Sequence, residues 1–347
     1  MPHTHDYIAF VGRFEPFHNG HLSVLRRALE ACEHPVVLIG SAESPRSSKN
    51  PWSAGEREIM IRAALGPDAD RIIFRHVCDH LYNEGAWQAD IQQHVDEAII
   101  ADGRKPAEVK VALIGHDKDA SSWYLHAFPQ WQMIDVPFAT TLSATELRAH
   151  LFSEDEGALH LLQASVPPAV FDMIRAFKKT KAFATLTDEH NHIVAYKKAW
   201  AVAPYPPIFT TVDAVIVHSG HVLLVKRGAQ PGKGLWALPG GFVEQDETLL
   251  EAVIRELKEE TRIKIPAPVL KGSLKTRQVF DAPDRSQRGR TISYGFHFEF
   301  ISGDLPAVRG SDDAARARWV PLAEVRRLRE HLFEDHFFIL EHFLGAA

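Results

Sequence analysis

The sequence GFVEQDETLLEAVIRELKEETRI, residues 241–263, predicts a glycine-ended turn followed by an acidic helix. Glu256, Glu259 and Glu260 stand at positions i, i+3 and i+4, so they project from one face of that helix. Like charges this close repel one another, and a divalent cation removes the repulsion; hard oxygen ligands suit Mg2+ or Mn2+. A solvated acidic helix face is the alternative, but such a helix does not need the apolar, turn-forming LWALPGG that precedes this one.

The same residues resemble the signature of the Nudix hydrolases. The positions in register are Gly241, Glu247, Arg255, Glu256, Leu257, Glu259 and Glu260. One position departs: the family usually has Gly two residues after the last Glu, at a helix exit that favours a left-handed residue, and this chain has Arg262. The resemblance implies an α+β Nudix sandwich in which the three glutamates are catalytic. They would bind the metal together with the carbonyl of Gly240, while Arg255 and Glu247 pair to orient the helix.

Strand-like runs surround this helix in the second half of the chain. Val212–Val217 and Val222–Val225 predict a hairpin, and Leu235–Leu238 and Ile292–Ile301 predict further strands. The intervening Arg-rich loop, 277–290, resembles a substrate loop of Nudix proteins that handle ADP-ribose. That resemblance makes three arginines candidates to bind ADP-ribose, with an ordinary exposed loop as the alternative: Arg277, Arg288 and Arg290.

Two weaker features lie near the carboxyl end. Asp312 and Asp313 could assist a metal or a water, and solvated charges are the alternative. His331, His336 and His342 have helical spacing, together with two phenylalanines, and predict a packing helix rather than a metal site.

Composition limits the class of protein. The chain has 347 residues, enough for two cores, and its 45% hydrophobic and 24% charged residues are ordinary for a soluble protein. A net charge of −6 gives no general attraction for nucleic acid. Cys32 and Cys78 suit a reducing compartment, and neither a signal peptide nor a membrane span is predicted. We expect a cytoplasmic protein with no nucleic-acid or membrane partner; assembly into a homo-oligomer stays open.

The first half begins with a buried strand that ends at a phosphate-binding type of turn. Tyr7–Val11 predicts the strand and Leu22–Ala31 a helix, with the connection GRFEPFHNGH between them. Gly12 would allow a ligand close to the backbone, and Gly20 would free the helix start for phosphate. His18 and His21 could both reach one triphosphate and stabilise charge in its transition state; two surface histidines are the alternative.

HNGH is similar to the His-x-Gly-His motif of the nucleotidyltransferases, and the block from Gly12 to His21 resembles archaeal-type NMN (nicotinamide mononucleotide) adenylyltransferases. Two further stretches agree with that family: 40–58, in which Ser53 can cap a helix, and LSATELR, residues 142–148. In the second stretch, Ser143-x-x-Glu146 is also an ordinary capping box. The resemblance implies catalytic roles for Arg13, His18, His21 and Arg148. It implies ATP binding by Gly12, Phe14, Gly20, Ser143 and Thr145.

Strands and helices alternate through the first half. Arg71–Phe74 and Val109–Ile114 predict strands on either side of a helix, which favours a doubly wound parallel sheet of the Rossmann-like type. The resemblance implies that Asn83 and Trp87 hold the nicotinamide ring of NMN, and core packing is the alternative for Trp87. His116 and Asp117, in the loop after the fourth strand, are further candidates.

Together the two resemblances predict three segments: a nucleotidyltransferase domain at 1–185, a linker at 186–206 and a Nudix domain at 207–347. The proline cluster at Ala203–Phe209 suits an extended connector. They imply a bifunctional enzyme of NAD metabolism that uses ATP as a substrate and Mg2+, or Mn2+, as cofactor. The first domain would make NAD from ATP and NMN, and the second would hydrolyse ADP-ribose. Two alternatives stay open: a Nudix domain that only binds or senses a nucleotide, and AMP transfer to another acceptor such as nicotinate mononucleotide.

Overall fold

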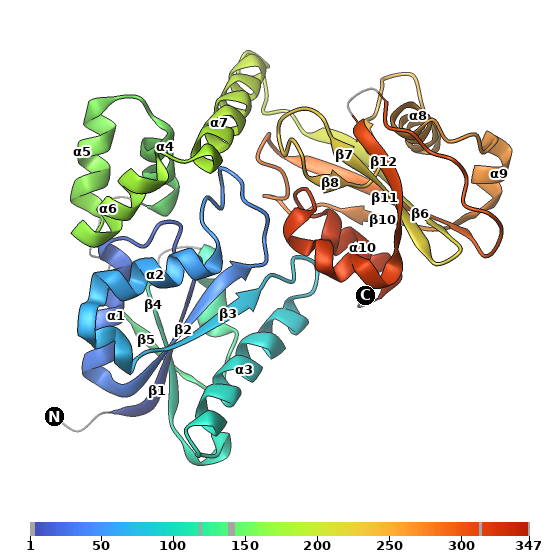
Figure 1. The fold of residues 1–347 in the computed structure, drawn as a ribbon. Coiled ribbons are helices and arrows are strands. Elements are labelled where there is room, and N and C mark those ends of the chain that lie inside the picture. The colour runs from blue at the N-terminus through green and yellow to red at the C-terminus, as the bar shows by residue number, and fades with distance from the viewer. Residues whose placement is uncertain (1–3, 118–119, 138–142, 312–313, 346–347) are drawn as a thin grey trace. The chain divides into compact units, whose positions relative to one another are not determined.

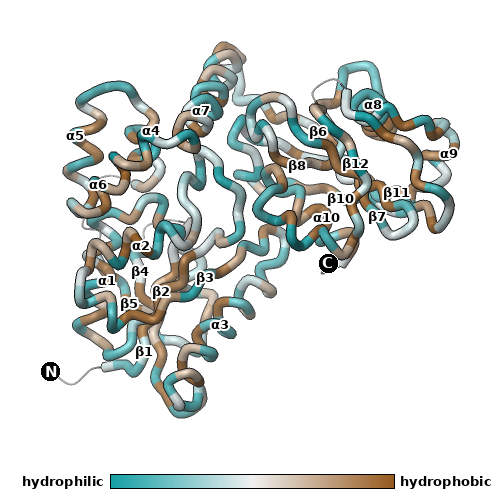
Figure 2. Tube along the Cα trace, viewed as in Figure 1, coloured by the Kyte–Doolittle hydropathy of each residue, from teal (hydrophilic) through white to brown (hydrophobic). Residues whose placement is uncertain are grey.

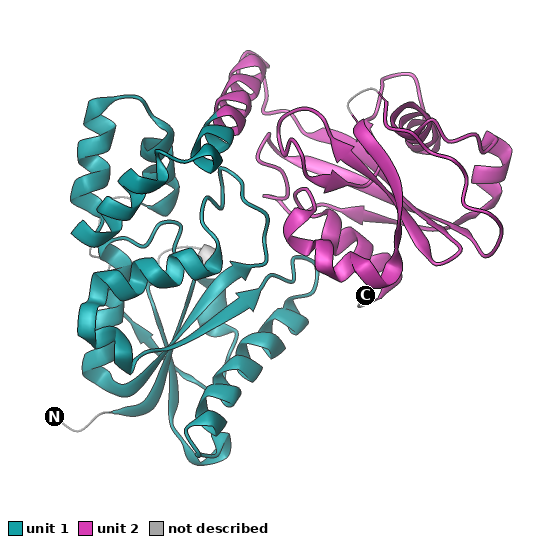
Figure 3. Ribbon diagram, viewed as in Figure 1, with its two compact units in different colours: residues 1–187 teal, residues 188–347 magenta. Residues whose placement is uncertain are grey.

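The computed structural model describes residues 4–117, 120–137, 143–311 and 314–345. The chain divides into two compact units, Met1–Thr187 and Asp188–Ala347 (Figure 3). The division falls within helix α7, Lys181–Trp200, so most of the predicted linker is helical. The proline-containing residues 201–208 that follow α7 form turns and irregular structure. Among the described residues, no helix is long and apolar enough to cross a membrane.

Unit 1 contains a five-stranded sheet in the order β3-β2-β1-β4-β5 (Figure 1). Every neighbouring pair is parallel, which confirms the predicted doubly wound sheet. The strands are β1 His5–Gly12, β2 Cys32–Ala42, β3 Ile73–Cys78, β4 Val111–Gly115 and β5 Gln132–Asp135. The α-helices are α1 Asn19–Ala31, α2 Ala54–Leu65, α3 Glu84–Ala101, α4 Ala144–Phe152, α5 Glu156–Ser165 and α6 Pro168–Phe177. Short 3-10 helices are η1 Gly66–Arg71, η2 Pro106–Glu108 and η3 Ala120–His126.

Both faces of this sheet are buried, as expected for parallel strands that helices cover on either side. In β1, Ile8 and Phe10 join the core beneath α1, α2 and α4–α6, whereas Tyr7 and Ala9 join the core beneath α3. Figure 2 shows the resulting hydrophobic strands. From β1 the chain adds β2 and β3 on one side and then β4 and β5 on the other, so the strand order reverses at β1. Ligands of such sheets bind at the carboxyl ends of the strands next to this reversal, which here means the loop after Gly12.

Unit 2 contains a mixed seven-stranded sheet. Its main path is β10-β11-β6-β7-β12, with β8 paired to β7 and β9 to β6. The strands are β6 Phe209–His218, β7 His221–Arg227, β8 Trp236–Ala237, β9 Gly240–Phe242, β10 Leu274–Phe280, β11 Thr291–Phe300 and β12 Ala314–Pro321. The helices are α8 Leu249–Thr261, α9 Ala267–Gly272, η4 Leu322–His331 and α10 His336–Leu344. This arrangement confirms the predicted α+β class.

Helices cover the two faces of the unit 2 sheet. Val212 and Ala214 of β6 pack in one core with Val253 and Leu257 of α8. Asp213, between them, points to the other face because side chains alternate along a strand. That face carries α10, since the Cα of Gly295 in β11 lies against Phe280 and Phe343 rather than against α8. The sheet therefore separates an apolar core under α8 from a face on which a charged strand residue can meet α10.

Candidate functional site

The loop after β1 is shaped from within by Phe14. Its backbone is left-handed, with φ of 57°. The ring is only 1% exposed and packs edge-on against Phe10 and His21. A Cβ on Gly12 would come within 2.9 Å of this ring, so the glycine is required by the packing as well as by any ligand. The ring of Phe14 therefore belongs to the core. Only the backbone of Phe14 is placed to meet ATP, the ligand that the motif resemblance implies for this residue.

His18 and His21 begin α1 and hold each other in place. Nδ1 of His18 accepts hydrogen bonds from the backbone N–H groups of Gly20 and His21, at 3.1 and 3.4 Å. Nδ1 of His21 accepts from the backbone N–H of His18 at 3.4 Å, and the two rings stack with centroids 3.7 Å apart. A nitrogen that accepts carries no proton, so each neutral ring has its proton on Nε2. The predicted pair thus forms two N–H donors at a helix start, which is the right end of a helix for phosphate.

A buried ionic clamp, which the sequence analysis missed, fixes this loop. The guanidinium of Arg57 is 1% exposed and donates to the carbonyls of Arg13 and Gly40, each at 2.6 Å, and to that of Ser41 at 3.1 Å. Its Nε lies 3.1 Å from Oε1 of Glu15. Burial outweighs the neighbouring guanidinium groups and raises the pKa of Glu15 to about 8. Arg57 therefore joins the carboxyl ends of β1 and β2.

Arg148 connects α4 to the same loop. Its Nη1 donates to the carbonyl of Glu15 at 2.7 Å and its Nη2 to Oγ1 of Thr145 at 3.1 Å. Burial lowers the pKa of Arg148 to about 10, which leaves the side chain charged at neutral pH. Ser143 forms the expected capping box with Glu146, and Leu142 lies outside the described residues. The structure thus brings Thr145 and Arg148 to the histidine loop, whereas Arg13 is exposed at its edge.

The two residues predicted for nicotinamide have structural roles in this molecule. Asn83 caps α3, where its Oδ1 accepts from the N–H of Ala86 at 3.0 Å. The ring of Trp87 lies 5.5 Å from that of Trp123 and 6.0 Å from that of Phe128. This aromatic cluster supports the packing alternative, and the nicotinamide role of both residues stays a prediction.

His116 and Asp117 join the loops after β4 and β5. Nδ1 of His116 lies 2.9 Å from the carbonyl oxygen of Val136. The N–H of Asp117 donates to Oδ1 of Asp135 at 3.1 Å. Oδ2 of Asp117 lies 3.0 Å from Nε2 of His126. Through these contacts both residues connect the loops at the carboxyl ends of β4 and β5.

The three glutamates of α8 line one pocket of about 410 Å3 in unit 2. The turn before α8 fits closely around them. A Cβ on Gly241 would come within 2.3 Å of Oε1 of Glu256, and the N–H of Gly240 donates to Oε2 of Glu260 at 3.0 Å. Glycine is therefore needed at the turn so that the carboxylates can reach the backbone.

Arg255 balances the charge of these carboxylates. It donates to both oxygens of Glu247, at 2.9 and 2.6 Å, which confirms the predicted structural pair. Its Nη1 also donates to Glu256 at 2.9 Å and to Glu259 at 3.1 Å. The bonds to Glu247, more than any other contact, raise the pKa of Arg255 and keep it charged.

The donor set fits a hard divalent cation, because three carboxylates line one pocket. Burial raises the pKa of Glu256 and raises that of Glu260 to about 8, which is the behaviour of buried carboxyls that lack a cation. In the part of the chain that the structure describes, no group of three or more His, Cys, Asp or Glu side chains is arranged to hold a metal. In this arrangement Arg255 is bonded to two of the three carboxylates, Glu256 and Glu259.

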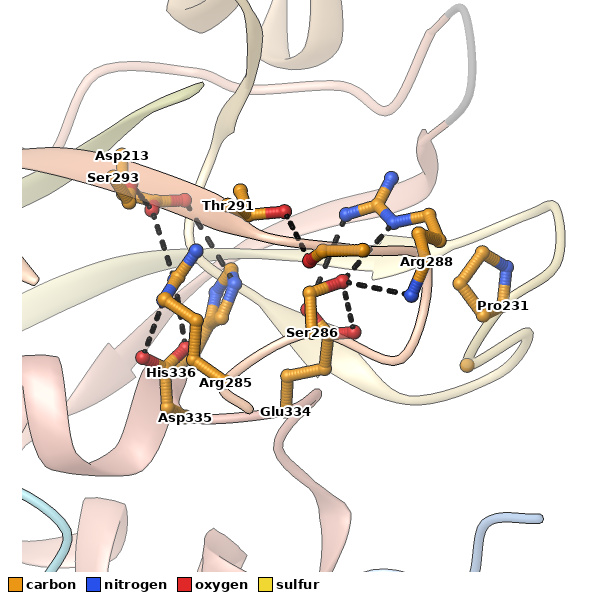
Figure 4. Close-up of polar contacts among 12 residues, drawn as sticks. Asp213, Pro231, Arg285, Ser286, Arg288, Thr291, Ser293, Glu334, Asp335 and His336 are labelled. Atoms are coloured by element: carbon orange, nitrogen blue, oxygen red, sulfur yellow. Dashed lines mark hydrogen bonds and ion pairs between the residues drawn. The ribbon is translucent and has the colours of Figure 1, made fainter. Parts of the chain in front are cut away.

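Residues of a buried polar network that the sequence analysis missed also line this pocket (Figure 4). Arg285 donates two hydrogen bonds of 2.7 Å to Asp335, and its Nη2 lies 3.9 Å from Oδ2 of Asp213. His336 accepts the N–H of Leu238 at 2.9 Å, and burial lowers the pKa of this imidazole to about 3. His336, predicted only to pack, thus anchors the strand that leads to Gly240. Ser293 donates to Asp213 from β11.

The predicted arginines of the 277–290 segment separate in the structure. Arg277 belongs to β10 rather than to a loop and is exposed, which corrects the expectation that it lies in the substrate loop. Arg290 donates to the carbonyl of Asp281. Arg288 lines the glutamate pocket, with its guanidinium 5.2 Å from the ring centroid of Phe242. Asp312 and Asp313 lie outside the described residues.

Arg262 occupies the helix exit at which the Nudix signature usually has glycine. Its backbone is left-handed, with φ of 53° and ψ of 23°, the conformation that glycine would adopt most easily. Nε donates to Oγ of Ser311 at 2.8 Å. The exit geometry is therefore kept, at the cost of a strained arginine.

Two family models match the chain. A cytidylyltransferase-like model matches residues 9–149, and a NUDIX domain model matches residues 208–341. The chain is 33% identical over 187 residues to a nicotinamide/nicotinic acid mononucleotide adenylyltransferase of Acinetobacter baylyi, covering 53% of this chain and 93% of that protein. It is 41% identical over 128 residues to an ADP-ribose pyrophosphatase of Methanocaldococcus jannaschii, covering 36% of this chain and 70% of that protein.

One solved protein resembles the chain along its whole length. It is a bifunctional NMN adenylyltransferase/ADP-ribose pyrophosphatase from Francisella tularensis, with a TM-score of 0.89, 35% identity and 99% coverage of both chains. A second structure of that protein, complexed with AMP and a manganese ion, gives a TM-score of 0.88 at 34% identity and 98% coverage of both chains.

Proposed function

The chain belongs to the family of bifunctional NMN adenylyltransferase/ADP-ribose pyrophosphatases, and from this premise we propose one reaction for each unit. Unit 1 transfers AMP from ATP to NMN, giving NAD and pyrophosphate. Unit 2 hydrolyses ADP-ribose to AMP and ribose 5-phosphate. The observation that carries the proposal is that one chain holds both the histidine pair at the start of α1 and the three glutamates of α8 with their Arg255–Glu247 pair.

In unit 1 the residues position phosphates and stabilise charge, and no covalent nucleophile is needed. A phosphate oxygen of NMN attacks the α-phosphorus of ATP while the bond to the β-phosphate breaks. The Nε2–H groups of His18 and His21 donate to the oxygens that gain charge, and the backbone N–H groups at the helix start add a favourable dipole. Arg57 and Arg148 hold the loop in shape, so they act through its backbone rather than on ATP.

In unit 2 both carboxylates and guanidinium groups line one pocket. Glu256, Glu259 and Glu260 would hold a divalent cation, Mg2+ or Mn2+, which supplies charge neutralisation and a lower pKa for bound water. Arg288 would contact the diphosphate, since it lines the same pocket as the glutamates. The Francisella protein, complexed with AMP and a manganese ion, supports a nucleotide and a divalent cation as ligands of this family.

A pocket that only binds a nucleotide is the main alternative for unit 2. A complete set of carboxylates argues for hydrolysis, because binding alone does not need a cation site of this charge. For unit 1, the name of the Acinetobacter relative covers both the nicotinamide and the nicotinic acid form of the mononucleotide, so nicotinate mononucleotide is a second candidate acceptor.

Product analysis of the purified protein tests the proposal directly. Incubation with ATP, Mg2+ and NMN should give NAD and pyrophosphate, and parallel incubation with nicotinate mononucleotide measures acceptor preference. A separate incubation with ADP-ribose and Mg2+ or Mn2+ should give AMP and ribose 5-phosphate in equal amounts. If ADP-ribose stays intact with either metal, the hydrolase assignment is wrong and a binding role is left for unit 2.

A further inference from the structure

A further carboxylate faces the glutamate pocket of unit 2 from outside the Nudix signature. Glu334 lies between η4 and α10 and lines the same pocket as the glutamates of α8. Its side chain is 10% exposed. Burial raises the pKa of this carboxyl, although Arg288 opposes the shift. A buried carboxylate at a phosphate-handling pocket needs an explanation, because its charge is costly to bury.

The backbone at Glu334 is strained. Its φ of 44° lies in the left-handed region that favours glycine. Both neighbours are anchored: the N–H of Phe333 donates to the carbonyl of Trp236 at 2.8 Å, and Asp335 holds the two 2.7 Å bonds from Arg285. Such strain persists only where the surroundings impose it, and it collects at functional sites. The anchored neighbours thus force Glu334 into this turn.

The carboxylate itself is oriented by two partners (Figure 4). Oγ of Ser286 donates to Oε1 at 2.8 Å, and Nη2 of Arg288 lies 3.9 Å from Oε2. Arg288 is in turn placed over the ring of Phe242. The other charged groups that act on Glu334 are Asp335 and Arg285 from the same wall. Glu334 is therefore a fixed carboxylate rather than a mobile surface charge.

We propose that Glu334 accepts the proton of the water that attacks the diphosphate. This inference rests on the proposed hydrolysis in unit 2. The water oxygen forms a bond to one phosphorus, its proton passes to Glu334, and the bond from that phosphorus to the bridging oxygen breaks. The bridging oxygen keeps the electron pair and leaves on the other phosphate, and the proton later returns to solvent. Carboxylates that bind a cation are poor proton acceptors, so a base from outside α8 separates the two tasks.

Glu334→Gln tests the proton transfer, because glutamine can still accept from Ser286 but cannot take a proton. We expect kcat for ADP-ribose hydrolysis to fall by ~100-fold or more. Mn2+ affinity, measured directly by electron paramagnetic resonance on the full chain, should stay within about threefold of the wild type because Glu334 is not a ligand. Glu330→Gln is the matched control: this glutamate is exposed on η4 and should change neither quantity.

Glu334→Gly separates a catalytic from a structural role. Glycine relieves the backbone strain but also removes the contacts with Ser286 and Arg288, so the thermal midpoint of unit 2 should change little while hydrolysis is lost. If the carboxylate served only to hold Ser286 and Arg288 in place, hydrolysis would survive in the glutamine variant, which can still accept from Ser286.

Three other outcomes would show whether the role of Glu334 or the proposed hydrolysis itself is wrong. Loss of Mn2+ binding in Glu334→Gln would make this residue a metal ligand and overturn the proposal. Full hydrolysis by either variant, with an active wild type, would overturn it while leaving the proposed function intact. A wild-type protein that binds Mn2+ but leaves ADP-ribose intact would remove the proposed hydrolysis itself.

Discussion

The two sites handle phosphate groups with opposite charge. The site in unit 1 presents donors: imidazole N–H groups, the amide groups of a helix start, and a loop held by two buried guanidinium groups. The site in unit 2 presents three carboxylates, with Arg255 bonded to two of them. The first site can meet a phosphate directly, whereas the carboxylates of the second need a cation between themselves and any phosphate.

The difference also concerns how complete each site is without ligand. Arg57 bonds to backbone carbonyls that no ligand displaces, so the loop of unit 1 is already shaped. Arg255 bonds to Glu256 and Glu259, which a metal would have to take over. We infer that unit 1 is preorganised, and that unit 2 is completed by its metal.

The largest expected effect tests whether the carboxylates serve unit 2 alone. Glu260→Gln keeps the size of the side chain and an acceptor for the N–H of Gly240, but removes a metal-binding charge. ADP-ribose hydrolysis should fall by roughly 1,000-fold, and excess Mg2+ should restore little of it. NAD synthesis, assayed on the same preparation, should stay within about twofold because its metal arrives with ATP. Equal losses of both activities would contradict the view that the glutamates of α8 serve unit 2 alone.

His18→Ala probes the donor site. Loss of one transition-state donor should lower NAD synthesis by ~100–1,000-fold, with ADP-ribose hydrolysis unchanged. The variant also loses the cap of α1, which costs about 1 kcal/mol of the free energy of unfolding. His18→Asn is the matched variant, since asparagine caps helices well: it should recover thermal stability and leave NAD synthesis low. Recovery of synthesis by asparagine would reduce His18 to a helix cap.

The metal affinity of unit 2 should depend on pH. Because burial raises the pKa of Glu260 to about 8, this carboxyl holds a proton in the metal-free protein below that pH, and a cation must displace it. Mn2+ affinity should therefore rise by up to ~tenfold per pH unit and level off above about pH 8. Titrations followed by electron paramagnetic resonance measure the slope, which Glu260→Gln should flatten. A wild-type affinity independent of pH would contradict this view of the site.

The smallest effect is expected at Arg262. Arg262→Gly removes left-handed strain but also the bond to Ser311, so the thermal midpoint of unit 2 should rise by only ~1–3 °C. Hydrolysis should stay within a few-fold, because the residue follows the last glutamate at the helix exit. Hydrolysis that appears only in the glycine variant would mean that the wild-type site binds nucleotide without cleaving it.

Local pattern predicted most of the fold. Continuous apolar runs predicted β1 and β4, and the spacing of the glutamates predicted α8. Helix α7 was missed because polar and charged residues are spread over most of its surface, which leaves no clear apolar stripe. Arg277 was placed in a loop for a related reason: β10 has exposed side chains along most of its length, and such an edge strand lacks a hydrophobic signal.

In the two sites, too, residues close together in the sequence could be predicted and residues far apart could not. The histidine pair and the glutamates of α8 could be predicted because each set lies within a few consecutive residues. Glu15, Asp213 and Arg285 could not be, because each is a single charged residue whose partner lies 37 to 80 positions away. A buried charge has the same letter in the sequence as a solvated one. Only the tertiary fold brings such partners together.

The clamp in unit 1 has a consequence for synthesis of the protein on the ribosome. Arg148 reaches the carbonyl of Glu15 across 133 positions, and Arg57 reaches that of Arg13 across 44. A nascent chain that has not yet exposed α4 lacks one of these two supports, so the histidine loop emerges early and takes its shape late. We expect the nucleotide site to form in one cooperative, long-range step rather than turn by turn. Truncated chains that end before α4 should leave the loop disordered even where β1 and β2 have already paired.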